Sequence, residues 1–446
     1  MLDPHKMKAA KSMVWPASKE RKELDRIAAQ YAGPRLVMVT ENVYTAIGYG
    51  VSNMILVETG EGIVAIDTTN SQRAARDALD AFRAISKAPV TAIVYTHSHP
   101  DHVLGGKAFS NNKVEVYAHE SFLDELPLQA LLGKSGAVRG ARMFGASLLQ
   151  SERLAPNISE YPLPIAAEFI FEPVAPDSVV KPTETFNGKK TSFDIGGVTF
   201  HLYHTPGETA DHTIVHMPQL GVVACGDIFY PSFPNLYTIR GCGVRPVLEW
   251  AEAQNRIIAL HPHHLLQGHG FPVQGREEIR TVLSNYRDAI LHVHDLALGA
   301  VQNFEPIDEV VKEAVLPHHL ARLPYLIQSY GHIPYCIRSI YNSYVGWFDG
   351  NPANLSPLSR KELGKEVITL AGSVKDVLQH LEKAQEEGRH QAVLELCEMV
   401  LGNDPDNDTA RRLKVNSLMA MSHLSANAPT ANYYRSSAED SKIERE

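Results

Sequence analysis

THSHPDH, residues 96–102, places three histidines and an aspartate within seven positions, directly after the apolar run APVTAIV at 88–94. A short continuous apolar run is typical of a strand covered on both faces. His97 and His99 are two residues apart beyond that strand, so both imidazoles can point to one side. Asp101 and His102 follow Pro100, where we expect a helix to begin. The motif therefore offers two ligands to one metal ion and two to a second ion nearby, and these groups suit zinc.

Three further candidate ligands lie downstream, each at the end of a predicted strand. They are Glu208 in HTPGETADH, Asp227 in ACGD and His269 in LLQGHG. In the first segment, Asp211 and His212 are alternatives to Glu208. Their placement at strand ends, together with the HxHxDH spacing, favours one dinuclear site.

The sequence pattern divides the chain into two parts. Up to about residue 280, short apolar segments alternate with turns; residues 51–59 and 62–69 predict a hairpin, and Ser71 is expected to cap a helix over 72–86. Beyond that point, apolar residues recur at helical spacing. We therefore predict an α/β sandwich followed by an all-α region. The predicted divisions are an N-terminal extension at 1–34, a catalytic domain at 35–280 and a helical domain at 281–440.

Composition excludes several classes of protein. The net charge of −9 over 446 residues argues against a nucleic-acid partner. The N-terminal residues contain no apolar signal region, and no run of about 18 apolar residues predicts a membrane span. The four cysteines form no CxxC pair, which favours a reducing, cytoplasmic location; they are Cys225, Cys242, Cys336 and Cys397.

The motif order HxHxDH, PGE, GD and GHG resembles the metallo-β-lactamase superfamily over residues 35–280. FPNLYTIRG at 233–241 and YVGWFDGNPANL at 344–355 are similar to the alkyl sulfatases of that superfamily. Residues 381–418 and 432–438 resemble that family's dimerisation domain. The resemblance implies an αββα sandwich, a helical dimerisation domain and a homodimer. In the family a sterol-carrier-like domain follows, and we expect this chain to lack it.

The resemblance also implies how two zinc ions would be held. One ion would take three ligands, the other would take three, and one carboxylate would bridge both. The sets are His97, His99 and Glu208 for the first ion, Asp101, His102 and His269 for the second, and Asp227 as the bridge. The sequence departs from the family pattern at three places: the family has a glutamate in place of Asp227, a TEA-type turn around Glu208, and a histidine near Tyr335.

The charge of this centre bears on the substrate. Two zinc ions, three carboxylates and a bridging hydroxide sum to a neutral site, so a sulfate-like anion needs a separate cation. Arg240 is the predicted cation, because its guanidinium fork can hold two oxygens. Asn235 and Tyr237 are expected to add neutral hydrogen bonds. His332 and Tyr335 are candidates for the acid that protonates the leaving group.

The sequence thus predicts a dinuclear zinc hydrolase that cleaves sulfate esters, with the metal-bridging hydroxide as nucleophile and a small anionic ester as substrate. The predicted catalytic residues are Asp101, Asn235, Tyr237 and Arg240. An alternative keeps the site but cleaves a carboxylic ester, lactone or thioester. The intact ligand set argues against a non-catalytic dimeric binding protein. The second histidine of HxHxDH argues against a di-iron redox site, because iron would favour a carboxylate at that position.

Overall fold

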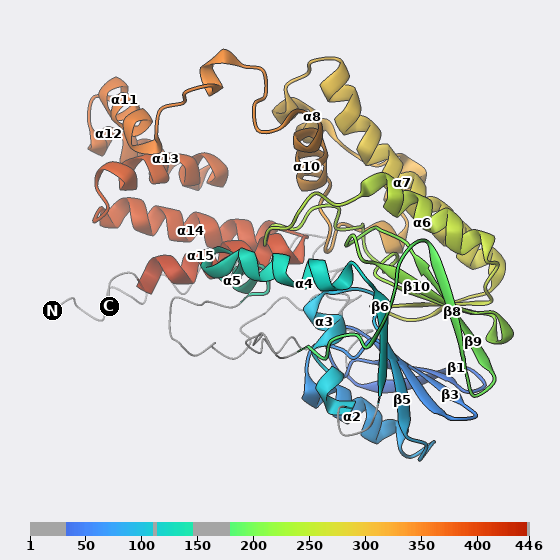
Figure 1. Ribbon diagram of the computed structural model, residues 1–446. Coiled ribbons are helices and arrows are strands. Elements are labelled where there is room, and N and C mark those ends of the chain that lie inside the picture. The colour runs from blue at the N-terminus through green and yellow to red at the C-terminus, as the bar shows by residue number, and fades with distance from the viewer. Residues whose placement is uncertain (1–32, 110–113, 146–178, 444–446) are drawn as a thin grey trace.

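The protein was analysed as a computed structural model that describes residues 33–109, 114–145 and 179–443. The predicted extension at 1–34 therefore lies almost wholly outside the described residues. Two β-sheets face each other (Figure 1), one of seven and one of six strands. In sheet order, the first contains β1 (Arg35–Thr40), β2 (Val43–Ile47), β3 (Met54–Thr59), β4 (Gly62–Ile66), β5 (Val90–Val94), β6 (Glu115–His119) and β7 (Glu184–Phe186). The second contains β13 (Val273–Gln274), β12 (His264–Gln267), β11 (Val222–Gly226), β10 (Thr213–Met217), β9 (Val198–His204) and β8 (Lys190–Ile195).

The sheets are held together by the apolar side chains between them. Strand residues of both sheets, among them Val57, Val64, Phe200 and Leu202, form one buried cluster. Strands β4 and β11 are buried on both faces, so their outer faces must be covered as well. Packing the two sheets together removes their facing apolar side chains from water.

Helices cover both outer faces. Helix α2 (Gln72–Phe82) packs on the first sheet through Ala75, Ala78 and Phe82. Helices α6 (Val247–Ala259) and α7 (Arg276–Gln302) pack on the second sheet, where Trp250 is fully buried. The predicted αββα sandwich is confirmed. The predicted hairpin is β3–β4, and the Ser71 side chain accepts from the Ala74 N–H at the start of α2, as expected.

The described helices that follow α7 in the chain form the predicted all-α region. Helices α12, α13 and α14 share an apolar cluster of their own, and Figure 1 shows α11, α12 and α13 far from the two sheets. Helix α15 returns to α5 at the sandwich, where Arg142 pairs with Asp440 at 2.8 Å. Three further described α-helices belong to the part of the chain that forms the sandwich: α3 (Pro100–Val103), α4 (Phe122–Leu131) and α5 (Gly133–Met143). The described α-helices after α7 are α8 (Ile307–Glu313), α9 (His318–Ala321), α10 (Ile333–Val345), α11 (Arg360–Ala371), α12 (Val374–Glu386), α13 (His390–Asn403), α14 (Asp408–Leu424) and α15 (Ala428–Ile443).

The predicted domain boundary at 280/281 falls inside α7, which runs unbroken from Arg276 to Gln302 and packs against both α6 and α10. The division at 280 therefore stays a prediction. Within the described parts of the chain, every helix is too short or too polar to cross a membrane.

Candidate metal centre

The HxHxDH loop is set by the end of β5. Thr96 follows the strand, and its backbone N–H and hydroxyl donate to the two oxygens of Asp67, each at 2.8 Å. Pro100 begins helix α3, as the sequence predicted, with His99 as its N-cap. The loop therefore leaves the strand in one fixed direction, and His97 and His102 are completely buried.

Asp67 is a positioning residue that the sequence analysis missed. It lies directly after β4 with φ of +58°, a left-handed conformation that a residue with a side chain adopts at a cost. Its Oδ2 lies 2.7 Å from Nδ1 of His102. Holding Nδ1–H in this way leaves Nε2 of the same ring to bind a metal ion. In the sequence, Asp67 is marked only by its place at the end of a predicted strand, which does not single it out from other polar residues at strand ends.

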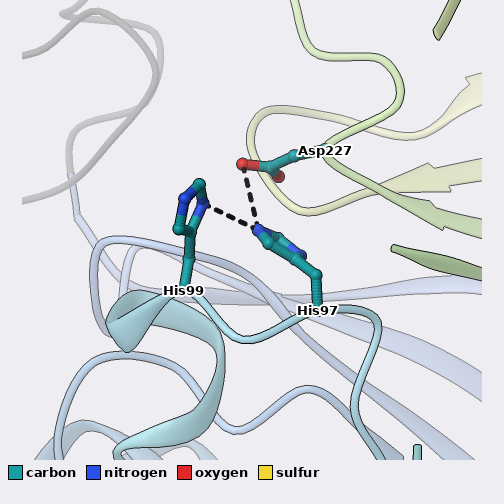
Figure 2. Close-up of side chains that lie close together, drawn as sticks. All are labelled: His97, His99 and Asp227. Carbon is teal, nitrogen blue, oxygen red and sulfur yellow. Dashed lines mark hydrogen bonds and ion pairs between the residues drawn. The ribbon is translucent and has the colours of Figure 1, made fainter. Parts of the chain in front are cut away.

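The first group of ligand atoms comes from His97, His99 and Asp227 (Figure 2). Nε2 of His97 lies 3.0 Å from Nδ1 of His99 and 4.0 Å from Oδ2 of Asp227. Oε1 of Glu208 lies 3.9 Å from the same Nδ1 of His99. The structure thus places Glu208 beside the first group, and its role as a ligand stays a prediction.

The second group contains Asp101, His102 and His269. Nε2 of His269 is 3.4 Å from Oδ2 of Asp101, and Nε2 of His102 is 3.5 Å from the same oxygen. Nδ1 of His269 lies 3.0 Å from the carbonyl oxygen of Val51, which directs Nε2 inward. The Asn53 side chain donates to the carbonyls of Gln267 and Gly270 and so fixes the loop that carries His269.

Asp227 lies between the two groups. Its Oδ2 is 3.3 Å from Nε2 of His269, and its Oδ1 is 3.5 Å from Nε2 of His102. Two glycines make this approach possible. Gly226 has φ of +49°, and a Cβ there would meet His212 and Thr96; a Cβ on Gly268 would meet Asp227 itself. This position fits the bridging role that the resemblance implies for Asp227, and that role stays a prediction.

The buried polar atoms of this cluster fit metal ions. Among the described residues, His102 Nε2, Asp227 Oδ1 and Glu208 Oε2 are buried without a hydrogen-bond partner. Such atoms are costly unless something in the functional protein binds them. Imidazole nitrogens and carboxylate oxygens are the donors that zinc takes. The donor set therefore fits two metal ions, while the assignment of each ligand stays a prediction.

Without metal, the carboxylates of the cluster raise the pKa values of two nearby histidines. Burial opposes protonation of His269, but Asp227 and Asp101 raise its pKa to about 10. Burial likewise opposes protonation of His102, and the same carboxylates raise its pKa well above the usual value. Burial lowers the pKa of His97 well below its usual value. In the second group, the raised pKa values therefore favour the protonated forms of His102 and His269 when no metal ion is bound.

Glu208 differs from its two competitors in what its side chain contacts. His212 accepts from the Asp227 backbone N–H through Nε2 at 3.0 Å, and its ring stacks on His97 with centroids 4.8 Å apart. Asp211 accepts from the Ser98 hydroxyl at 3.2 Å, and burial raises its pKa to about 7. Both support the loops of the site, whereas Glu208 faces the ligand nitrogen of His99.

A matched pair of substitutions distinguishes these roles. Glu208→Gln should remove one of two zinc ions per chain, because a neutral amide is a poor zinc ligand. Asp211→Asn changes a buried carboxylate of the same loop in the same way and should leave both ions bound. Metal analysis after dialysis measures the difference. Loss of zinc in Asp211→Asn with full occupancy in Glu208→Gln would move the ligand to Asp211.

The predicted anion-binding residues lie in the loop after β11. Nη2 of Arg240 is 3.2 Å from Nε2 of His99, which places a half-buried cation beside the first group. Asn235 is buried, and its Nδ2 has no hydrogen-bond partner among the described residues. Tyr237 is half-buried, and no hydrogen bond joins its described side chain to the seven ligands. Arg240 therefore reaches the centre, while the role of Tyr237 stays a prediction.

Arg245 is a second arginine at the centre that the sequence analysis missed. Its Nη1 donates to Oε1 of Glu208 at 2.8 Å, and both side chains are buried. Burial raises the pKa of Glu208 to about 7, although Arg245 acts to lower it. The sequence offered no pattern that would separate Arg245 from Arg240, five residues earlier.

The candidate acids for the leaving group lie on α10. The hydroxyl of Tyr335 is 3.0 Å from that of Thr430, and its ring lies 4.4 Å from the ring of His332. Burial lowers the pKa of His332 to about 4. No contact between either side chain and the seven ligands is found in the described part of the chain. Their proposed role stays untested.

Comparison with known families settles the identity of the fold. Residues 47–290 match the metallo-beta-lactamase superfamily, and residues 306–443 match the alkyl sulfatase dimerisation family. A linear primary-alkylsulfatase of Pseudomonas sp. (strain ATCC 19151) is 33% identical over 86% of this chain and 72% of its own length. The chain belongs to the alkylsulfatases of the metallo-β-lactamase superfamily. The resemblance drawn from the sequence motifs is confirmed, and with it the prediction of a hydrolase.

Two further relatives extend the match along the chain. An (R)-specific secondary-alkylsulfatase of Pseudomonas sp. is 28% identical over 97% of this chain and 65% of its own length. The solved structure of the stereoselective inverting sec-alkylsulfatase Pisa1 from Pseudomonas sp. has a TM-score of 0.86 at 27% identity, covering 97% of this chain and 69% of that one. This alkylsulfatase thus shares both the sandwich and the helical region with its relatives, and it spans about two thirds of their length.

Proposed function

We propose that this alkylsulfatase hydrolyses sulfate monoesters of alkyl alcohols at a centre of two zinc ions. Water and the ester would give the alcohol, sulfate and a proton. The observation that carries the proposal is the place of Arg240, whose guanidinium lies beside a ligand cluster that can hold two ions. The alkylsulfatase activities named for its relatives support cleavage of a sulfate ester bond.

Zinc ions held by the two ligand groups would lower the pKa of a water molecule and so supply a hydroxide nucleophile. The chain's own residues would do the rest. The His99 ring turns its Nδ1 toward the ligand cluster and its Nε2 toward Arg240. When Nδ1 binds metal, Nε2 carries the ring's proton and no longer accepts a hydrogen bond. Arg240 is then free to donate to two oxygens of a sulfate group.

Asn235 would supply a neutral hydrogen bond to the same group. Its backbone is held on both sides, because its N–H donates to the Tyr230 hydroxyl at 2.7 Å and its carbonyl accepts from Arg245 at 2.6 Å. Its Nδ2 is the part left without a partner among the described residues. A donor fixed in this way loses little entropy when it binds an anion.

A substrate panel tests the proposal against the carboxylic ester, lactone and thioester alternative. A medium-chain alkyl sulfate should be cleaved at least a hundredfold faster, by kcat/KM, than the matched acetate ester and lactone of the same chain length. Sulfate release and alcohol release should be equal. Faster cleavage of the acetate or lactone by the zinc-loaded protein would refute a sulfatase and keep the hydrolase.

We also propose that the protein is a homodimer, which its match to the dimerisation family supports. Large apolar side chains remain exposed along that region, including Trp347 at 73% and Leu370 at 88%. Exposed apolar side chains are common where they gather at a contact between two copies. The cytoplasmic location inferred from the cysteines stays a prediction.

Light scattering tests the dimer. At micromolar concentration the mass should be about twice the single-chain 49.2 kDa. Trp347→Asp with Leu370→Asp should weaken association at least tenfold, because each change buries a charge in the interface. Met38→Asp, at a 65% exposed position on β1, is the control and should leave the mass unchanged. A wild-type mass of 49.2 kDa would refute the dimer.

A further inference from the structure

Arg245 and Glu208 form a buried ion pair beside the first ligand group. Nη1 of Arg245 lies 2.8 Å from Oε1 of Glu208, and their side chains are 3% and 4% exposed. The same Oε1 lies 3.9 Å from Nδ1 of His99, while Oε2 is buried without a hydrogen-bond partner among the described residues. One carboxylate oxygen is thus held by the arginine, and the other keeps its lone pairs for an ion.

Several contacts hold the guanidinium of Arg245, although its Nε and Nη2 are buried without a hydrogen-bond partner among the described residues. Its residue precedes Pro246, the N-cap of α6, so the helix start sets its backbone. Its guanidinium carbon lies 5.9 Å from the centre of the Trp250 ring, and Trp250 is held by a 2.8 Å hydrogen bond to the Ile228 carbonyl. Arg245 is therefore a buried side chain that the Trp250 ring and two oxygen acceptors hold in place.

The same arginine joins two functional segments. Its Nη1 donates both to Glu208, on the loop between β9 and β10, and to the carbonyl of Asn235, on the loop after β11. Asn235 is the residue whose Nδ2 points to no partner in the described structure. One side chain thus ties the proposed first metal position to the proposed anion-binding loop.

Stability alone does not explain this arrangement. A buried ion pair costs about as much in desolvation as it returns, and apolar side chains of the same volume would often be as stable. A metal-ligating carboxylate, in contrast, must be deprotonated and held in a fixed orientation. Hydrogen-bonding partners behind the ligand supply that orientation.

We propose that Arg245 is a positioning residue that orients the Glu208 carboxylate toward the first metal ion and, through the Asn235 carbonyl, sets the anion-binding loop on the same centre. The inference rests on the proposed zinc centre. It assigns the two arginines of one loop to separate tasks: Arg240 faces the substrate anion, and Arg245 acts through a ligand.

Metal binding tests the inference without relying on activity. Arg245→Met should weaken zinc at the first position ten- to a hundredfold, as loss of a partner behind a ligand usually does. The second position, formed by Asp101, His102 and His269, should keep its affinity. Arg245→Lys should recover part of the loss, and Arg240→Met is the matched control that should keep both ions. Zinc titration and the absorption spectrum of the cobalt(II) form measure the two positions separately.

A double variant separates positioning from a general role in folding. If Arg245 acts through Glu208, adding Arg245→Met to Glu208→Gln should change zinc binding no further. Removing both charges should also restore the yield if Arg245→Met alone folds poorly. Wild-type affinity at both positions in Arg245→Met, or equal weakening of both, would overturn the inference. A wild-type protein that binds no metal would instead overturn the proposed zinc centre.

Discussion

Removal of metal by a chelator should abolish hydrolysis of an alkyl sulfate by this protein, and zinc should restore it. The loss should be at least a thousandfold, which corresponds to about 4 kcal/mol of transition-state stabilisation. The reason is that the cluster supplies donors for ions, with His102 Nε2 and Asp227 Oδ1 buried and unpartnered among the described residues. Metal analysis and a sulfate-release assay on the same samples test it.

Single substitutions should divide this effect between two positions. Asp101→Ala and His269→Ala should each leave one zinc ion per chain, because both residues belong to the second group. The fold should persist, since the ligands lie on loops while the apolar cluster between the sheets is untouched. Circular dichroism provides the control. A native protein with no bound transition metal would contradict the whole proposal.

Zinc uptake should also depend on pH. In the metal-free protein the pKa of His269 is raised to about 10, so at neutral pH this ring carries a proton that zinc must displace. The pKa of His102 is raised as well. Zinc affinity should therefore fall as pH falls, by about tenfold per unit for each proton displaced. Competition with a chromophoric chelator between pH 6.5 and 8.5 measures the slope, and a flat profile would contradict it.

The parts of this structure that local sequence determines were predictable. The hairpin β3–β4 and the Ser71-capped helix α2 follow from alternation, helical spacing and a capping residue. The four candidate ligands of residues 97–102 were identifiable because their spacing is itself the signal. Glu208, Asp227 and His269 required one more step, namely that strand ends mark the edge where the loops of both sheets meet.

The missed residues depend on long-range packing. Glu208 and Arg245 are 37 positions apart, and their contact depends on how the loop between β9 and β10 meets the start of α6. Nothing in the local pattern distinguishes Arg245, which is buried, from Arg240, which is half-exposed. The contact also changes the charge count, because Arg245 adds a positive charge beside a centre that the sequence analysis counted as neutral. Attraction of an anion therefore does not depend on Arg240 alone.

Arg240→Ala should nevertheless lower kcat/KM for an alkyl sulfate by a hundredfold or more, equivalent to about 2–4 kcal/mol. Nη1 of Arg245 is engaged by Glu208 and Asn235 and the side chain is buried, so we do not expect it to replace the half-exposed fork that Arg240 offers to two sulfate oxygens. Arg240→Lys should recover only part of the loss, because an ammonium group cannot donate in the same bidentate geometry. Zinc content should not change, since Arg240 contacts a ligand without being one.

The same substitution distinguishes the anionic from the neutral substrate. A neutral carboxylic ester or lactone needs no such clamp, so Arg240→Ala should cost it less than tenfold. Because Arg240 is half-exposed, ionic strength must be held fixed while the two substrates are compared. A loss below tenfold on the alkyl sulfate, with both zinc ions retained, would show that the sulfate group is bound elsewhere. It would leave the metal-dependent hydrolase intact and refute Arg240 as the residue that selects a sulfate ester.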